Sequence, residues 1–318
     1  MHSGGCTIGE RPIDLHLYAL QKLGAEITVG EVIHAKAPKL KGCEIVFPFP
    51  SVGATENAML AAVLAEGTTI IRNCAREPEI EDLQGYLNSC GAKVRGAGSS
   101  DIIIEGVKSL HSCDEYSIMP DRIEAGTFLI AGAATYGKVL VRNIIPTHIY
   151  SLIEVLYGIG CRIEITNDSV YVESARRLLN TNGGINVKTL PYPGFPTDLQ
   201  APLTSLFCIA SGSSVIEETI FENRFKHVPE LIKMGADIEY LNDNSILING
   251  VDHLHGGDLI SSDLRCGAAL IIGGLAAEGN TYIDDEHYIE RGYADIEKKF
   301  QSLGGDIKTV KLCATRIV

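Results

Sequence analysis

Cys90-Gly91-Ala92-Lys93-Val94 is one of five copies of a short motif that decides the fold of this 318-residue sequence. In each copy an apolar residue is followed by glycine, a small residue, a charged residue and a β-branched residue. Such a glycine ends a helix because it tolerates the left-handed conformation needed there, and the β-branched residue begins a strand. The other copies are at 23–27, 159–163, 234–238 and 303–307, so that successive glycines are 67, 69, 75 and 69 residues apart. The pattern predicts helix–strand repeats of similar length.

A second motif, glycine followed by a short β-rich segment, alternates with the first and begins at Gly67, Gly137, Gly212 and Gly279. Each copy follows a segment rich in small apolar residues, at about 54–65, 122–136, 199–210 and 264–277. Apolar residues extend most of the way around these predicted helices, which is typical of buried helices. One repeat cannot close its own core, so we expect helices inside and sheets outside, the reverse of the usual α/β layering.

The number of repeats predicts two domains with a boundary near Met119-Pro120. Two copies of the first motif precede this boundary, and three follow it. A symmetric molecule would contain six, so we expect that one repeat is missing at the N-terminus and that the first domain is incomplete. The predicted domains are 1–119, which retains two repeats, and 120–318, which has three.

Composition narrows the class of protein. Hydrophobic residues make up 45% of the chain and charged residues 21%, as in soluble globular proteins. The net charge of −13, without a basic run, argues against a nucleic-acid partner. No window approaches the length of a membrane-spanning segment, and no signal peptide is recognised. Nine scattered cysteines without a CxxC pair predict reduced thiols in a cytoplasmic protein, and argue against a disulfide framework or a zinc site.

The stretch from Gly4 to Leu15 places Cys6 between glycines and then reads Arg11-Pro12-Ile13-Asp14-Leu15. Glycines allow the thiol to approach a substrate and withdraw. Pro12 suits the first position of a helix, whose free N–H groups would form an anion site beside Arg11 and favour the thiolate. An ordinary free thiol near a chain end is the alternative for Cys6, and composition alone does not decide between them.

Further polar groups lie at predicted strand-to-helix junctions, where loops present side chains. An aspartate there is often only a helix cap and an arginine only a surface ion pair. Arginines at equivalent junctions of several repeats in an acidic protein nevertheless indicate a phosphorylated substrate. Cys6 would then act as proton donor or nucleophile and Asp198 as base, in a cleft between two domains. The junctions include Pro50-Ser51-Val52-Gly53, Thr197-Asp198, Arg224, Asp263-Leu264-Arg265 and Arg291.

Taken together, these motifs resemble the UDP-N-acetylglucosamine enolpyruvyl transferases (1-carboxyvinyltransferases) of the EPSP synthase superfamily. The resemblance extends from Gly4 to about Lys308. It is carried by the segments 4–16, 51–55, 75–79, 195–200, 221–225 and 263–265.

This resemblance implies a fold and a reaction. The fold is an inside-out α/β barrel of two domains with pseudo-threefold βαβαββ repeats. The reaction transfers enolpyruvyl from phosphoenolpyruvate to the 3-hydroxyl of UDP-N-acetylglucosamine and releases phosphate, as the first committed step of peptidoglycan synthesis and the target of fosfomycin. It requires no cofactor and no metal.

The resemblance also implies roles for individual residues. Cys6 matches the general acid that protonates the enolpyruvyl methylene and can form a covalent adduct, and Asp198 matches the base for the sugar hydroxyl. The remaining matches are substrate-binding positions: Arg11, Pro12, Ile13, Asp14 and Leu15 for uridine and phosphate; Pro50, Ser51, Val52 and Gly53 for the diphosphate; Ile220 lining the substrate; Arg265 and Arg291 for phosphoenolpyruvate.

Two alternatives remain. In such enzymes a segment upstream of Cys6 supplies further substrate-binding residues, so a non-catalytic substrate-binding remnant is one alternative. The other is a 5-enolpyruvylshikimate-3-phosphate synthase-like transferase, against which the cysteine loop and the Arg11–Leu15 segment argue. We expect small-molecule substrates, no nucleic-acid or membrane partner, and self-association or pairing with the missing N-terminal segment.

Overall fold

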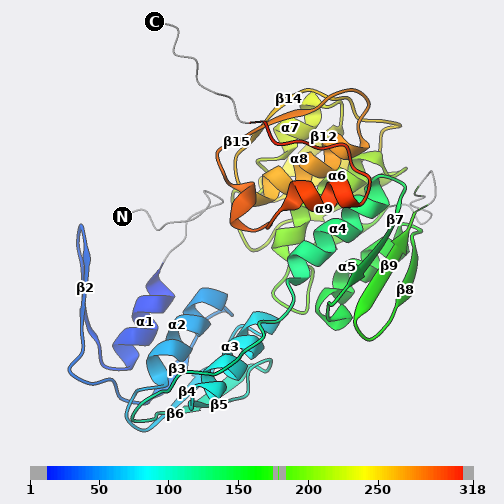
Figure 1. Ribbon diagram of the computed structural model, residues 1–318. Coiled ribbons are helices and arrows are strands. Elements are labelled where there is room, and N and C mark those ends of the chain that lie inside the picture. The colour runs from blue at the N-terminus through cyan, green and yellow to red at the C-terminus, as the bar shows by residue number, and fades with distance from the viewer. Residues whose placement is uncertain (1–12, 175–177, 179–183, 311–318) are drawn as a thin grey trace, which may run out of the picture. The chain divides into compact units, whose positions relative to one another are not determined.

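The computed structural model describes residues 13–174, 178 and 184–310, which form two compact units (Figure 1). Unit 1 comprises 13–120 together with Leu190–Pro196, and unit 2 comprises Asp121–Thr189 together with 197–310. The return of a short segment to unit 1 is held by the backbone N–H of Tyr192, which donates to the Glu77 carboxylate at 3.3 Å.

Unit 1 contains three helices and six strands among its described residues. A hairpin, β1–β2, is separate from a four-stranded sheet of order β3-β4-β6-β5. The elements are α1 (Asp14–Lys22), β1 (Glu26–Val29), β2 (Ile33–Lys36), β3 (Glu44–Val46), α2 (Val52–Ala62), β4 (Thr68–Arg72), α3 (Pro78–Ser89), β5 (Lys93–Arg95) and β6 (Asp101–Glu105).

The described residues of unit 2 form three sheets, of orders β7-β9-β8, β10-β11-β13-β12 and β14-β15. Its helices are α4 (Arg122–Ala134), η1 (Pro146–Ile149), α5 (Tyr150–Gly158), η2 (Thr197–Leu199), α6 (Gln200–Ile209), α7 (Val228–Lys233), α8 (Leu264–Ala276), η3 (Ile289–Arg291) and α9 (Ile296–Ser302). Its strands are β7 (Lys138–Arg142), β8 (Arg162–Ile165), β9 (Ser169–Glu173), β10 (Asn186–Lys188), β11 (Ser213–Glu217), β12 (Asp237–Asn242), β13 (Ser245–Asn249), β14 (Asp258–Ser261) and β15 (Tyr282–Asp285).

The predicted repeat is confirmed by the way the sheets are paired. In unit 1 β3 runs parallel to β4, and β4 and β5 both run antiparallel to β6. In unit 2 β10 runs parallel to β11, and β11 and β12 both run antiparallel to β13. The five motif glycines that end helices all have φ between 91° and 101°, the left-handed conformation that the motif predicted.

The inside-out layering is also confirmed in unit 2, where α4, α6 and α8 pack against one another at the centre. All ten residues of α6 are buried. Such a helix has no face for water, so its apolar circumference must contact the other helices and the sheets around it. The inverse α/β layering predicted from the helix composition is therefore the one observed.

The expectation of complete burial is wrong for α2 in unit 1. Its buried side carries Ala54, Ala58 and Met59 and packs toward Ile71 and Ile104 of the sheet. The opposite side includes Leu60, which is 55% exposed, so apolar composition did not predict burial at this position.

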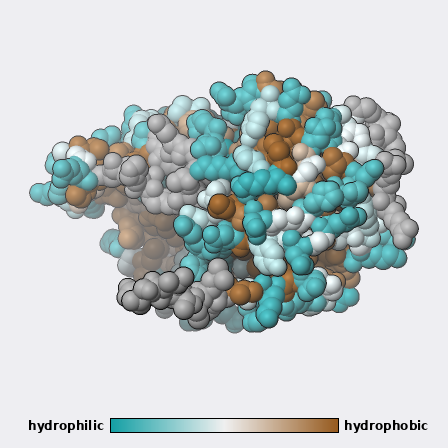
Figure 2. Space-filling model, turned by 90° about the horizontal axis from the view of Figure 1, so that it is seen from above, coloured by the Kyte–Doolittle hydropathy of each residue, from teal (hydrophilic) through white to brown (hydrophobic). Residues whose placement is uncertain are grey.

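Hydrophilic and hydrophobic residues are interspersed over the face seen in Figure 2. Within the described part of the chain, no helix is both long enough and apolar enough to cross a membrane.

Candidate active site

In unit 2 two arginines hold one carboxylate, that of Asp198. Asp198 lies in η2, just before the buried helix α6. Its Oδ1 accepts a hydrogen bond from Arg224 Nη2 at 2.6 Å and another from Arg265 Nε at 3.1 Å. Arg224 comes from the loop between β11 and α7, and Arg265 from the first turn of α8. Three segments far apart in the chain therefore meet at one carboxylate.

The arginines determine the ionisation of this carboxylate. Burial would raise the pKa of Asp198, but the charges of Arg265 and Arg224 outweigh it and lower the pKa below its ordinary value. The Arg224 side chain is only 4% exposed, whereas that of Asp198 is 40% exposed. In this ion pair the arginine is therefore buried, whereas the carboxylate is accessible to solvent.

Tyr293 and Thr127 hold Arg265 in place. Arg265 Nη1 donates to the Tyr293 hydroxyl at 3.0 Å, and that hydroxyl lies 2.9 Å from Thr127 Oγ1 in α4. Tyr293 is buried, and this burial raises the pKa of its hydroxyl, which remains protonated near neutral pH. The guanidinium is therefore fixed by a neutral hydroxyl on one side and by the carboxylate on the other.

Asp263 has a different role from Asp198, although both were candidate helix caps. Its carboxylate accepts from the backbone N–H groups of Arg265 and Cys266, at 2.9 and 3.1 Å, and so caps α8. This cap satisfies two of the otherwise unpaired N–H groups at the helix start and orients the turn that carries Arg265. No side chain caps α6, so the cap interpretation is wrong for Asp198.

Glu218 connects the loops on either side of Asp198. This buried carboxylate accepts from the hydroxyls of Thr189 and Thr197, each at 2.9 Å. It also accepts from the backbone N–H groups of Ile220 and Phe221, at 2.8 and 3.2 Å. One side chain thus fixes both the residue before Asp198 and the predicted substrate-lining Ile220.

Arg291 lies on η3, which packs against α8. The packing is close, because a Cβ added to Gly292 would lie 2.7 Å from Leu264 Cδ2. Arg291 is exposed and Arg265 is mostly buried, so the two predicted phosphoenolpyruvate-binding arginines come from one corner of unit 2 but differ in surroundings.

Unit 1 brings together the two predicted nucleotide-binding segments. His16, next to Leu15, lies 3.1 Å from Asn57 Nδ2 through its Nδ1, and a Cβ on Gly53 would lie 3.1 Å from its ring. Ser51 caps α2 by accepting from the N–H of Ala54 at 3.4 Å.

A hollow of about 420 Å³ adjoins the same region of unit 1. It is lined by Asp14, Leu15, Tyr18, Val46, Phe47 and Pro48. Ile13, Pro50 and Val52 are half-buried beside this region, whereas Cys6, Arg11 and Pro12 lie outside the described residues.

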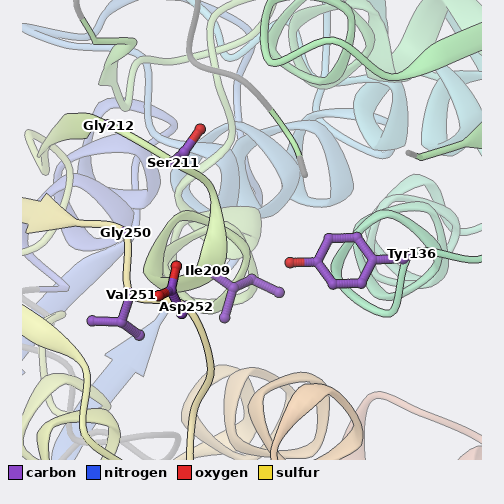
Figure 3. Close-up of a pocket in the computed structure, with 7 residues that line it drawn as sticks. All are labelled: Tyr136, Ile209, Ser211, Gly212, Gly250, Val251 and Asp252. Carbon is purple, nitrogen blue, oxygen red and sulfur yellow. The ribbon is translucent and has the colours of Figure 1, made fainter. Parts of the chain in front are cut away.

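A second hollow, of about 360 Å³, lies at the opposite end of α6 from Asp198 (Figure 3). Tyr136, Ile209 and Asp252 line it together with Ser211, Gly212, Gly250 and Val251. It contains none of the predicted site residues, so we do not assign a substrate to it.

Comparison with known proteins is consistent with this arrangement. The sequence profile of the EPSP synthase (3-phosphoshikimate 1-carboxyvinyltransferase) family matches residues 2–300. The chain belongs to this family. The match covers both units and all of the segments that meet at Asp198.

Relatives within the family are named UDP-N-acetylglucosamine 1-carboxyvinyltransferase. The chain is 50% identical over 305 residues to one from Caldanaerobacter subterraneus subsp. tengcongensis, covering 96% of this chain and 72% of that one. It is 51% identical over 309 residues to one from Desulforapulum autotrophicum, covering 97% and 73%.

Solved structures of the family share the fold. The enolpyruvyl transferase NikO from Streptomyces tendae superposes with a TM-score of 0.83 at 24% identity, covering 94% of this chain and 73% of that one. EPSP synthase from Acinetobacter baumannii superposes with a TM-score of 0.71 at 21% identity, covering 97% and 74%.

Several site residues were not assigned from the sequence. Arg224 was named only as a junction residue, with a surface ion pair as the alternative, yet its guanidinium binds Asp198, 26 residues earlier. Its place in the 221–225 motif was the available signal. For Tyr293 and Glu218 no signal existed, because a buried tyrosine or a strand-end glutamate is common in any fold.

Proposed function

We propose that this chain transfers enolpyruvyl from phosphoenolpyruvate to the 3-hydroxyl of UDP-N-acetylglucosamine, in peptidoglycan synthesis and in the cytoplasm. The observation that carries the proposal is the solvent-facing Asp198 carboxylate bound by Arg224 and Arg265. A base beside two guanidiniums suits a reaction that deprotonates a hydroxyl next to a substrate with a phosphate and a carboxylate. Relatives of about 50% identity bear the name of this activity.

In the proposed reaction the sugar 3-oxygen forms a bond to C2 of phosphoenolpyruvate, and its proton passes to Asp198. A proton from Cys6 goes to C3, which becomes a methyl group. The Cys6 thiolate then takes one proton back from C3, the bond between C2 and the phosphate oxygen breaks, and inorganic phosphate leaves with the proton held by Asp198. The double bond is thereby restored in the product.

While both arginines contact it, Asp198 has a lowered pKa and is a weaker base than a free aspartate. We propose that the anionic groups of phosphoenolpyruvate take over the guanidinium of Arg265 and also engage Arg291. Loss of one cationic partner raises the pKa of the Asp198 carboxyl toward the range where it accepts a proton. The base would thus become active only when the donor substrate is bound.

For unit 1 we propose that residues 11–15 and 50–53 hold the uridine and diphosphate. The support is the proximity of His16 to Gly53 and the hollow lined by Asp14 and Leu15. The start of α2, where Val52 and Gly53 are half-buried, offers backbone N–H groups to an anion.

Phosphate release from phosphoenolpyruvate in the presence of UDP-N-acetylglucosamine tests the proposal. We expect phosphate and a nucleotide-sugar product of matching mass from the unmodified chain. Asp198→Asn should lower kcat by about 10²- to 10⁴-fold, the usual contribution of a positioned base. Asp237→Asn, a change on the exposed strand β12, is the control and should leave kcat unchanged.

The other outcomes separate the alternatives. Full turnover by Asp198→Asn would remove this residue from the mechanism. Phosphate release with shikimate 3-phosphate but not with the nucleotide sugar would favour the synthase-like alternative. Binding of the nucleotide sugar without phosphate release from phosphoenolpyruvate in the presence of either acceptor would favour a non-catalytic remnant.

A further inference from the structure

His253, His255 and Glu278 form a cluster on unit 2 that the proposed reaction does not use. Each side chain offers one ligand atom, and these atoms all lie within 4.8 Å of one another. The three residues are exposed. The two imidazole rings have their centroids 5.0 Å apart and meet edge to face.

The backbone beneath the cluster is fixed by hydrogen bonds of ordinary length. The N–H of His255 donates to Met234 O, that of Glu278 to Leu254 O and that of Gly256 to Glu278 O, each at 2.8 Å. His255 and Glu278 are partners in a parallel β-bridge, and Leu254 between the histidines is buried. Extended backbone places alternate side chains on the same side, so both imidazoles face away from the core beside the carboxylate.

Unit 1 contains the same scaffold with different side chains. There the N–H of Gly42 donates to Glu66 O at 2.8 Å, that of Glu66 to Leu40 O at 2.9 Å, and Lys41 pairs with Glu66 in a parallel bridge. On that scaffold the Lys39 ammonium contacts the Glu66 carboxylate at 3.0 Å.

The repeat register makes His253 the counterpart of Lys39 and Glu278 the counterpart of Glu66. In unit 1 these two positions are in direct contact through the Lys39–Glu66 ion pair. In unit 2 the cationic lysine is replaced by imidazoles, which are neutral ligands when deprotonated. The Glu278 carboxylate thus has two imidazole nitrogens beside it, whereas the Glu66 carboxylate in unit 1 has the Lys39 ammonium.

From this arrangement we propose that His253, His255 and Glu278 bind a divalent transition-metal ion of the zinc and nickel class. Imidazole and carboxylate are suitable ligands for these ions, and three protein ligands leave a position for water. Metal–ligand bonds of about 2.0–2.2 Å require ligand atoms within about 4.4 Å of one another. Exposed side chains can rotate to close this distance while the backbone stays in place.

Isothermal titration of the full chain with Ni²⁺ near neutral pH tests the proposal. We expect one ion per chain at this site, and at least tenfold weaker binding for His253→Ala and for His255→Ala. Glu278→Gln should weaken binding by a smaller factor, because the amide keeps a neutral oxygen. His287→Ala, which removes another exposed histidine beside an acidic residue, is the control and should bind like the unmodified chain.

Thermal unfolding supplies a second readout. Ni²⁺ should raise the unfolding temperature of the unmodified chain and of His287→Ala, but not of His253→Ala or His255→Ala. Unfolding temperatures without the ion should be equal, which would exclude a folding defect. Absence of binding up to about 1 mM Ni²⁺, or unchanged affinity when all three ligands are replaced, would overturn the proposal.

Discussion

The basicity of the Asp198 carboxylate depends on which cationic groups contact it. Two guanidiniums stabilise its charged form, and only the carboxylate side of the pair is open to solvent. Breaking a pair that includes a nearly buried arginine leaves an uncompensated charge, unless an incoming anion replaces the carboxylate. This is why a substrate with two anionic groups is expected to separate the pair where water does not.

Thiol reactivity gives a prediction at the same scale. Fosfomycin should add its mass to the peptide containing Cys6 and to no other cysteine peptide. Burial raises the pKa of Cys74 and Cys161 to about 12 and also raises that of Cys208, so these thiols are poor nucleophiles. Mass spectrometry after digestion provides the measurement.

Iodoacetamide at the same pH is the control, because it should label the half-buried Cys43 and Cys113 as well. Equal labelling of Cys6, Cys43 and Cys113 by fosfomycin would count against a special site at Cys6.

At the scale of elements, the site depends on a short 3-10 helix and two loops that have little structure of their own. Glu218 ties them together through four hydrogen bonds from two hydroxyls and two backbone N–H groups. Such a buried carboxylate is satisfied only if every donor faces it, which fixes the loops in one arrangement.

Replacing Glu218 with Gln tests this role as a positioning residue. The amide nitrogen of Gln would place a donor where the neighbouring groups are already donors, so the two segments that carry Thr197 and Ile220 should shift. We expect kcat per folded molecule to fall about 10- to 100-fold, the effect of misplacing a catalytic group by a fraction of an ångström to one ångström. Steady-state kinetics corrected for the folded fraction give this value.

Glu217→Gln is the matched control, since Glu217 is exposed and pairs with Lys188 at the surface. It should change kcat little. A loss in Glu218→Gln that is explained entirely by a smaller folded fraction would show a structural role only.

At the scale of the whole molecule, stability depends on a core that several repeats share. His227 is buried in that core of unit 2, and its Nε2 has no hydrogen-bond partner among the described residues. Burial, with a smaller contribution from the charge of Arg224, outweighs the attraction of Asp263 and lowers the pKa of His227 to about 3. The imidazole is therefore neutral in the folded unit.

This pKa predicts how stability changes with pH. Below the ordinary pKa of 6.5 the unfolded chain binds a proton at His227 that the folded chain does not bind. Its contribution is therefore fully present above pH 6.5 and is lost as the pH falls toward 3, by up to about 1.4 kcal/mol per pH unit. Urea unfolding between about pH 7 and pH 4.5 should show a shallower loss of stability for His227→Phe.

His34→Gln, which changes an exposed histidine, is the control and should follow the unmodified chain. Identical pH dependence in His227→Phe and the unmodified chain would contradict the assignment of a neutral buried imidazole.

Much of the fold could be predicted because the repeat is local and periodic. The glycines that end helices, the strands that follow them and the buried character of α4, α6 and α8 depend on residue types within a few positions. The same reasoning failed for Leu60 of α2, which is exposed. The composition of a helix shows which residues it could bury, but burial also requires a neighbouring element to cover them. We retain the boundary near Met119-Pro120 as a proposed domain boundary.

The sequence by itself determined the repeat and the layering of helices and sheets, and it made Asp198 and Arg265 candidate residues of the site. Only the tertiary structure decided that Arg224 binds Asp198, that Tyr293 holds Arg265, and that Glu218 joins the loops beside them. Backbone preferences act over a few residues and can therefore be predicted from the sequence. The partner of a charged side chain is a group that folding brings within about 3 Å of it. In this site those groups come from distant repeats.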